Sequence, residues 1–315
     1  MSADRYDVVV IGGGAAGLSA ATILSRSRRR VLVVDAGDPR NARAGHVHGY
    51  LGREGAPPHE LLASGREEVR SYGGEVRPGR VVDVTGRRGD FTVALEDGSA
   101  VHARRLLLAT GVTDVLPDID GVADRWGRDV LHCPYCHGWE VRDRRVGVIP
   151  FPFMPTHVAQ LFRQLTDRVT LFAAGVELDD EQRHGLEARG IDIVEGAVAA
   201  VEVHDDALTG VRLVDGDVIP LDALAVATRL EARAELAERL GAEMIDVPVG
   251  RHVSLGPMGA TTVPGLWVAG NVSNPMAQVV VAAAEGTMTG AVINADLVDE
   301  DIATALATSA LSGWR

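Results

Sequence analysis

The stretch Asp7-Val8-Val9-Val10-Ile11-Gly12-Gly13-Gly14-Ala15-Ala16-Gly17 decides the fold of this chain of 315 residues. It joins a short apolar run to a glycine cluster, and a helical pattern continues from it to about Arg26. A second apolar run, Val31–Val34, then ends in Asp35. Strand, turn, helix and strand in this order predict a βαβ unit.

The glycine cluster has the spacing Gly-x-Gly-x-x-Gly. Gly12 permits a tight turn, Gly14 lets the backbone approach a pyrophosphate, and Gly17 lets the helix pack on the strand. The helix N-terminus supplies N–H groups for the phosphates. Asp35 ends the second strand, where a carboxylate binds a ribose hydroxyl and disfavours a 2′-phosphate. The sequence therefore predicts a dinucleotide site for FAD or NAD rather than NADP, with an incidental glycine turn as the alternative.

Composition narrows the class of protein. The net charge of −13 argues against DNA or RNA as a partner, because both need basic patches, and it disfavours an anionic membrane surface. The apolar fraction of 46% is enough for two cores. The start of the chain does not resemble a signal peptide, and charged and amide residues interrupt the apolar stretch 276–298, so we expect a buried helix there and a cytoplasmic protein.

The middle of the chain repeats the plan of its beginning. A strand, a helix and a second strand are expected at Val146–Ile149, Val158–Leu165 and Val169–Phe172. Three strand-like segments between Val81 and Leu108 are echoed at Val198–Val203, Val211–Val214 and Ala223–Ala227. This weak duplication predicts a second nucleotide-binding domain.

Two cysteines, Cys133 and Cys136, stand in a Cys-Pro-Tyr-Cys sequence, and the chain has no others. A C-x-x-C turn places both sulfurs within disulfide reach, so we interpret them as a redox pair. A zinc site is the rival, but the further ligands at hand, His132 and His137, each adjoin a cysteine and would close four ligands round one ion with strain. Inert buried thiols are the third alternative.

Several motifs resemble the low-molecular-weight thioredoxin reductases. Ala109-Thr110-Gly111 and Trp267-Val268-Ala269-Gly270-Asn271 resemble two further flavin contacts of that family, although the second motif usually ends in Asp, and Gln278 matches a flavin-contacting glutamine. The resemblance spans almost the whole chain. It implies an α/β protein with two Rossmann-like, three-layer ββα domains, FAD as cofactor and a homodimer. The FAD domain would comprise 1–116 and 245–315, and the inserted NADPH-type domain 117–244.

The resemblance also assigns roles to individual residues. Cys136 would lie against the flavin and Cys133 would exchange with substrate through a mixed disulfide. His137 replaces the family's usual Asp and could move the thiol proton, unless it merely faces solvent. The expected FAD-binding residues are Gly12, Gly14, Ala15, Ala16, Gly17, Asp35, Ala36, Arg40, Asn41, His48, Ala109, Thr110, Gly111, Gly270, Asn271, Gln278 and Val279.

The second nucleotide loop lacks its glycines. The strand Val146–Ile149 is followed by Pro-Phe-Pro-Phe-Met-Pro at 150–155, whose prolines have no N–H to donate. Losing two or three hydrogen bonds to a phosphate costs roughly 3–9 kcal/mol, which is about a hundredfold or more in affinity. No cation for a 2′-phosphate follows in Ala173–Glu177. We therefore expect this domain not to use NADPH.

Without NADPH, the electrons need another route. Cys-Pro-Tyr-Cys-His-Gly-Trp-Glu at 133–140, with Pro39-Arg40-Asn41 and His46-Val47-His48-Gly49, looks like the dithiol oxidases of gliotoxin, holomycin and romidepsin biosynthesis. That likeness implies oxidation of a small-molecule dithiol, with molecular oxygen as acceptor and hydrogen peroxide as product. Two alternatives stay open: a protein-disulfide reductase with another donor such as ferredoxin, and a non-enzymatic flavin-bound sensor. His46 and His48 could equally belong to a solvated loop, and Tyr135, Trp139, Phe151 and Phe153 could be substrate-pocket walls or core.

Overall fold

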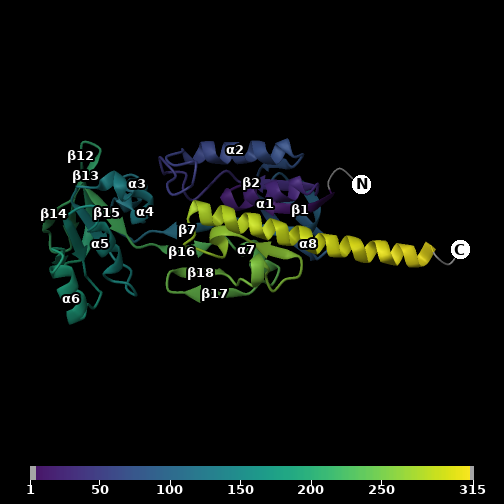
Figure 1. Ribbon diagram of the computed structural model, residues 1–315. Coiled ribbons are helices and arrows are strands. Elements are labelled where there is room, and N and C mark those ends of the chain that lie inside the picture. Colours follow the sequence, from purple (N-terminus) through teal and green to yellow (C-terminus); the bar gives the residue numbers. More distant parts are fainter. Residues whose placement is uncertain (1–4, 313–315) are drawn as a thin grey trace. The chain divides into compact units, whose positions relative to one another are not determined.

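A computed structural model describes residues 5–312 of the chain as two compact units (Figure 1). The first unit is assembled from residues up to 42, 56–113 and 230 onward. The second contains 43–55 and 114–229, so its larger segment is inserted between two segments of the first. The short segment 43–55 leaves the first unit between Asp35 and Pro58 and groups with the second.

The first unit is built on a mainly parallel sheet with the strand order β3-β2-β1-β6, and β19 pairs with the second half of β6. The first half of β6 pairs with an antiparallel meander of β5 and β4. Side chains alternate along β1: Val8 and Val10 enter one core and Val9 and Ile11 the other. Its strands are β1 (Arg5–Ile11), β2 (Val31–Asp35), β3 (Glu75–Pro78), β4 (Val81–Arg87), β5 (Asp90–Leu95), β6 (Ala100–Leu108) and β19 (Leu266–Val268).

Three longer helices belong to this unit: α1 (Ala15–Arg26), α2 (Pro58–Ser71) and α8 (Val279–Ser312). α1 and α8 pack closely because α8 carries glycine where it meets α1. A Cβ at Gly286 would lie 2.0 Å from the carbonyl oxygen of Ala16, and one at Gly290 would lie 2.9 Å from that of Ala20. α8 continues well past the expected end at Val298 and extends beyond the rest of its unit (Figure 1).

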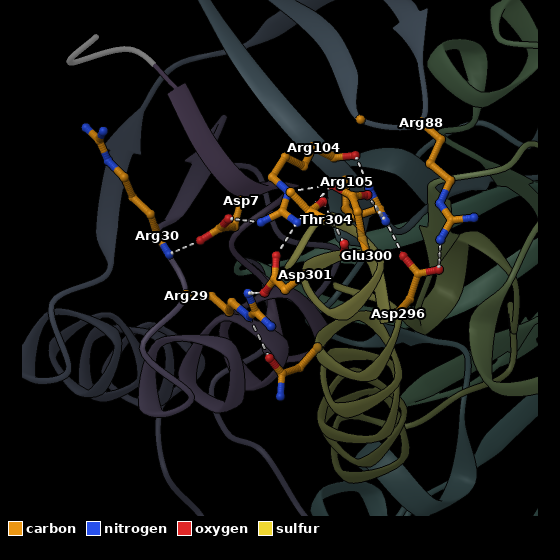
Figure 2. A network of polar contacts seen from close by, with 12 residues as sticks. Asp7, Arg29, Arg30, Arg88, Arg104, Arg105, Asp296, Glu300, Asp301 and Thr304 are labelled. Atoms are coloured by element: carbon orange, nitrogen blue, oxygen red, sulfur yellow. Dashed lines mark hydrogen bonds and ion pairs between the residues drawn. The ribbon is translucent and has the colours of Figure 1, made fainter. Parts of the chain in front are cut away.

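A network of ion pairs anchors the second half of α8 to the sheet (Figure 2). Arg105 on β6 is fully buried and pairs with Asp296 and, at 2.5 Å, with Glu300. Arg104 reaches Asp7 at 2.8 Å and Asp301 at 2.6 Å. Because an unpaired buried guanidinium would be costly, the position of α8 is fixed by these carboxylates as well as by its apolar contacts.

The second unit repeats the parallel plan with the strand order β11-β10-β9-β15-β8, beside a separate antiparallel sheet β12-β13-β14. Its strands are β8 (Val130–Leu131), β9 (Val146–Ile149), β10 (Val169–Phe172), β11 (Asp192–Val194), β12 (Val198–His204), β13 (Ala207–Leu213), β14 (Val218–Pro220) and β15 (Ala223–Val226). Its helices are α3 (Val122–Arg125), α4 (Pro134–His137), α5 (His157–Phe162) and α6 (Asp180–Glu187), with a 3₁₀ turn at Trp139–Val141.

A further small sheet has the order β17-β18-β16-β7. It comprises β7 (Val112–Val115), β16 (Arg229–Ala232), β17 (Met244–Val247) and β18 (Gly250–Val253), and α7 (Glu235–Arg239) follows β16. The remaining 3₁₀ turns are Pro257–Gly259 and Gly270–Val272.

The predicted α/β class with two Rossmann-like sheets is confirmed. The duplication is visible in the strand orders, since each unit has a strand–turn–helix–strand start on a parallel sheet accompanied by an antiparallel meander. The middle helix is shorter than expected: α5 ends at Phe162, not Leu165, because the chain turns there with Leu165 N–H donating to the Phe162 carbonyl.

Candidate functional site

The turn between β1 and α1 has the geometry of a dinucleotide cradle. Gly12 has a φ of +109°, and a Cβ there would lie 2.3 Å from the carbonyl oxygen of Ala109. A Cβ at Gly17 would lie 1.9 Å from the Gly12 carbonyl oxygen. At Gly14, the N-cap of α1, a Cβ would meet no atom within 4 Å, and no side chain caps the helix. The first-turn N–H groups without a side-chain cap and the open space at Gly14 fit a pyrophosphate.

Asp35 ends β2 beside this turn, as expected for a ribose-binding carboxylate. Its Oδ1 accepts hydrogen bonds from the N–H groups of Gly13 and Gly37, both at 3.2 Å. These bonds orient the carboxylate and leave Oδ2 available, with Arg66 at 3.9 Å. The local geometry therefore matches the role that the sequence predicts for Asp35.

The other flavin motifs lie in the same unit. Ala109 and Thr110 follow β6, which is the neighbour of β1, so both loops open at the same edge of the sheet. Thr110 Oγ1 donates to the Arg233 carbonyl at 2.5 Å, and Gly111 has a positive φ of 77°. Ala36 and Asn41 are in the loop after β2, exposed and half-buried respectively.

Asn271 has a structural task in addition to the expected contact with FAD. Its Nδ2 lies within 3.0 Å of the carbonyl oxygens of Asn274, Pro275 and Ala277, so the side chain closes the loop before α8. The side-chain oxygen of Asn271 takes no part in these three hydrogen bonds, so it can accept one from another donor. Arg40 donates to the Pro275 carbonyl at 3.1 Å and joins the loop after β2 to the same segment.

Sequence reasoning missed Glu285 as a member of this region. Its Oε2 accepts from the Gly270 N–H at 2.9 Å, and its Oε1 accepts from the Asn274 side chain at 2.6 Å. A charged residue inside the apolar pattern of α8 was the signal that could have found it. Gln278 is exposed just before α8, and Val279 begins the helix.

The cysteine pair is held by a single helical turn in the second unit. Cys133 is the N-cap of α4, Pro134 occupies the first position, and the N–H of Cys136 donates to the Cys133 carbonyl at 3.2 Å. Proline suits that first position because its missing N–H would have no helical partner. The two Sγ atoms lie 2.6 Å apart, so the predicted redox pair is brought together with both side chains half-buried.

His137 follows directly and is partly buried. Its Nε2 is a buried atom without a hydrogen-bond partner among the described residues. Burial holds the pKa of His137 below its usual value, while the carboxylate of Glu140 acts against this and the rings of His48 and His46 reinforce it. A neutral imidazole with a vacant nitrogen beside two thiols is suited to accept a proton.

His48 lies in the second unit with segment 43–55, whereas the other expected FAD-binding residues lie in the first. Its Nδ1 is 2.6 Å from Glu54 Oε1, its Nε2 is 3.4 Å from Glu140 Oε1, and its ring is 6.1 Å from that of His46. Glu54 and Glu140 are thus further site residues that the sequence analysis did not single out.

The glycine-free loop after β9 is packed from within. Phe151 is 7% exposed and its ring meets His132 edge-on at 5.9 Å, while the more exposed Phe153 ring lies 5.3 Å from Phe151. Pro150 and Pro155 are also buried. Of the two phenylalanines in this loop, Phe151 is therefore the one that enters the core, and it packs against the residue before Cys133.

Comparison with known proteins agrees with this geometry. The family model described as pyridine nucleotide-disulphide oxidoreductase matches residues 6–286. The chain belongs to this family. It is 32% identical over 95% of its length to "Thioredoxin reductase sirT" of Leptosphaeria maculans, covering 96% of that protein, and 31% identical over 93% to "Thioredoxin reductase tcpT" of Claviceps purpurea, covering 94%. The crystal structure of HlmI matches with a TM-score of 0.90 and 44% identity, covering 99% of this chain and 98% of that one.

Membership of the pyridine nucleotide-disulphide oxidoreductase family makes the protein a thioredoxin reductase-like oxidoreductase that depends on FAD. The β1–α1 turn and Asp35 fit that cofactor, as described above. Within residues 5–312, no helix combines the length and apolarity needed to cross a membrane. In the same part of the chain, no three His, Cys, Asp or Glu side chains are grouped so as to hold a metal ion.

Proposed function

We propose that this protein is a dithiol oxidase, which forms a disulfide in a small-molecule dithiol with molecular oxygen as the final acceptor. The overall reaction is R(SH)₂ + O₂ → R(S₂) + H₂O₂. The observation that carries the proposal is the contrast between an intact redox pair at Cys133 and Cys136 and a second nucleotide loop closed by a buried Phe151.

The closed loop argues against a pyridine nucleotide as electron donor. Pro150 and Pro155 are buried and Phe151 occupies the turn where glycine would let a phosphate approach the backbone. A family member that keeps its cysteines without this site needs electrons from another source. A dithiol substrate supplies them through the cysteines themselves.

The protein's own groups suit the first half of the reaction. A substrate thiolate attacks Cys133 of the Cys133–Cys136 disulfide and forms a mixed disulfide, which releases Cys136 as a thiolate. The second substrate thiol then displaces Cys133, so that the substrate leaves as a disulfide and both enzyme sulfurs are reduced. His137 takes the proton of the attacking thiol, because its vacant Nε2 and lowered pKa keep it neutral near pH 7.

The second half returns the cysteines to the disulfide. FAD, when bound, would supply the two-electron chemistry that accepts electrons from the reduced cysteine pair and passes them to molecular oxygen, with hydrogen peroxide as the product. The residues that we propose to hold FAD are those of the β1–α1 turn, Asp35, the loop 109–111 and the loop 270–279. In this scheme Cys136 passes the electrons to the cofactor and Cys133 exchanges with the substrate.

We also propose that the protein is a homodimer in the cytoplasm. α8 carries an outward row of apolar side chains at alternating three- and four-residue spacing, including Val281, Met288, Val298 and Ile302, which are 41%, 49%, 40% and 53% exposed. Such a heptad-like row is typical of a helix that pairs with a second helix. A sedimentation mass close to that of one 33.3 kDa chain would contradict the dimer.

Anaerobic stopped-flow mixing tests the proposed activity. We expect dithiothreitol to bleach the yellow protein and NADPH to leave it oxidised, with oxygen uptake and peroxide formation on aeration. Cys136→Ser should abolish bleaching by dithiol while FAD stays bound, because the disulfide cannot form; Ser71→Ala on the exposed end of α2 is the control.

Rapid bleaching by NADPH would overturn the proposal, and so would undiminished turnover of Cys136→Ser. Bleaching by reduced ferredoxin alone would instead support a protein-disulfide reductase.

A further inference from the structure

Four titratable side chains of the second unit, three of which act electrostatically on His137, have no part in the thiol exchange itself. His46, His48 and Glu54 come from the segment 43–55, and Glu140 comes from the 3₁₀ turn after α4. This segment lies between β2 and α2 in sequence, yet it groups with the unit that carries the cysteines. The fold therefore brings a distant loop to the residue that we expect to accept the thiol proton.

Glu54 fixes the orientation of His48. Its Oε2 accepts from the Gly49 N–H at 2.8 Å, and its Oε1 lies 2.6 Å from His48 Nδ1. A carboxylate accepts a hydrogen bond, so Nδ1 of His48 carries a proton and Nε2 points toward Glu140. The hydrogen bond from His48 and then that from Gly49 hold the pKa of Glu54 below its usual value, which keeps this carboxylate ionised.

One proton can be shared between His48 and Glu140. Nε2 of a neutral His48 and the carboxylate oxygen of Glu140 are both acceptors, and at 3.4 Å they attract only when a proton is on one of them. With that proton on His48, the ring is a cation between two carboxylates. The ring therefore has a neutral and a charged state that both find partners in the structure.

Glu140, His48 and Glu54 form a chain of contacts that begins three residues after His137 and ends at an exposed carboxylate. The charges acting on His137 are those of Glu140, His48 and His46. The side chain of Glu140 is 40% exposed, that of His48 is 24% exposed, and that of Glu54 is 66% exposed. Glu54, at the end of this chain of contacts, is thus the most exposed of the three side chains.

Resting on the proposed dithiol oxidase function, we propose that Glu140 and His48 relay the thiol proton from His137 to solvent and that Glu54 positions His48 for this transfer. Each substrate dithiol releases two protons as its two sulfurs become a disulfide. His137 takes a proton from a thiol, Glu140 or His48 takes it from His137, and Glu54 or water receives it from His48. His137 returns to its neutral form and is ready for the second thiol.

Two measurements on the flavin-loaded protein test the relay. The first is the rate of anaerobic bleaching by dithiothreitol as a function of pH. We expect His48→Gln and Glu54→Gln to slow bleaching at pH 7 about tenfold, a fraction of the full effect of a general base. Added imidazole should restore much of the rate in a His48→Gly variant, since a free base can enter the space of the missing ring.

The second measurement is the pKa of His137, followed by NMR with labelled histidine. Glu140→Gln removes an anion that raises this pKa, so the pKa should fall; His48→Gln removes a ring that lowers it, so the pKa should rise. Opposite shifts are the signature of direct electrostatic contact, because general disruption of the loop would expose His137 and move both variants the same way. The control is His184→Gln, which changes an exposed histidine on α6 of the same unit.

The outcomes separate the relay from the proposed function. If dithiothreitol bleaches the unaltered protein but His48→Gln and Glu54→Gln bleach as fast, the relay is wrong and the dithiol oxidase stands. If bleaching is slower, but imidazole does not restore the rate and the two pKa shifts are not opposite, these residues have a structural role. That outcome also overturns the relay. If the unaltered protein is not bleached by dithiol, the proposed function and the relay fall together.

Discussion

The turns after β1 and after β9 occupy the same place in two similar sheets and have opposite properties. The first turn joins a parallel strand to the long helix α1. Its glycines allow close backbone contacts that a Cβ would block, and the space beside Gly14 is open. The second follows a parallel strand into the short helix α5, with buried prolines and the ring of Phe151 in the turn. A Rossmann-like frame thus forms with either kind of turn, whereas we expect nucleotide binding only where the turn presents N–H groups and an empty volume.

The frame survives in the second unit because its stability comes from the apolar strands and the helices on them. β9 is central in its sheet and pairs with β10 and β15, and Val146 and Val148 are fully buried. Filling the turn adds Phe151 to this core rather than removing anything from it. As a consequence, the ring of Phe151 packs against His132, the residue before Cys133.

The strongest test of the comparison is to place a side chain in the first turn. Gly12→Val should abolish FAD binding, with at least about a hundredfold loss of affinity, because φ is +109° and the new Cβ would lie 2.3 Å from a carbonyl oxygen. Bound flavin per protein, measured by absorbance, checks this. Gly45→Val, at an open position without positive φ, is the control. A Gly12→Val protein with a full complement of FAD would show that the turn does not need glycine.

A smaller effect is expected from emptying the second turn. Phe151→Ala should lower the free energy of unfolding by about 3–5 kcal/mol, because it removes a buried ring and leaves a cavity. Phe153→Ala, whose side chain is 43% exposed, should cost under about 1 kcal/mol and serves as the matched control. Urea unfolding measures both. Equal costs would mean that the turn is not part of the core, and the contrast between the two loops would be lost.

The smallest expected effect is on stability at acid pH. It concerns carboxylates that pair with a buried arginine in each of the two units. Arg125 in the second unit pairs with Asp129 and Asp206, and hydrogen bonds from Arg128 and Arg125 lower the pKa of Asp206 from 3.8 to about 2. A carboxyl with a lowered folded-state pKa stabilises the fold above its unfolded pKa, and this contribution disappears as pH falls from about 4 to about 2. Asp206→Asn should therefore flatten the loss of stability in that window.

In the first unit, burial raises the pKa of Glu300 but hydrogen bonds from Arg105 and Arg104 outweigh it and keep the pKa below its usual 4.5. Glu300→Gln should flatten the corresponding loss below pH 4.5, measured by thermal unfolding at a series of pH values. An unchanged pH profile in both variants would rule out these carboxylates as the acid-sensitive groups.

Local sequence patterns predicted most of the helices and strands, because strands and turns depend on short stretches of sequence. The run Asp7–Ile11 with its glycines predicted β1, the turn and α1, and the pair Cys133 and Cys136 predicted the redox turn. The end of α8 was missed by 14 residues, between Val298 and Ser312, since the last turns of this helix carry an outward apolar row instead of a buried face.

The sequence by itself determined the two nucleotide-type sheets, the flavin turn and the closed second turn, because glycine, proline and alternating apolar residues act on their nearest neighbours. Only the tertiary structure decided that His48 joins Glu54 to Glu140, that Glu285 holds the loop of Gly270, and that Phe151 rather than Phe153 is buried. These contacts join residues up to about ninety positions apart. No local pattern specifies them, since they follow from the packing of whole strands and loops.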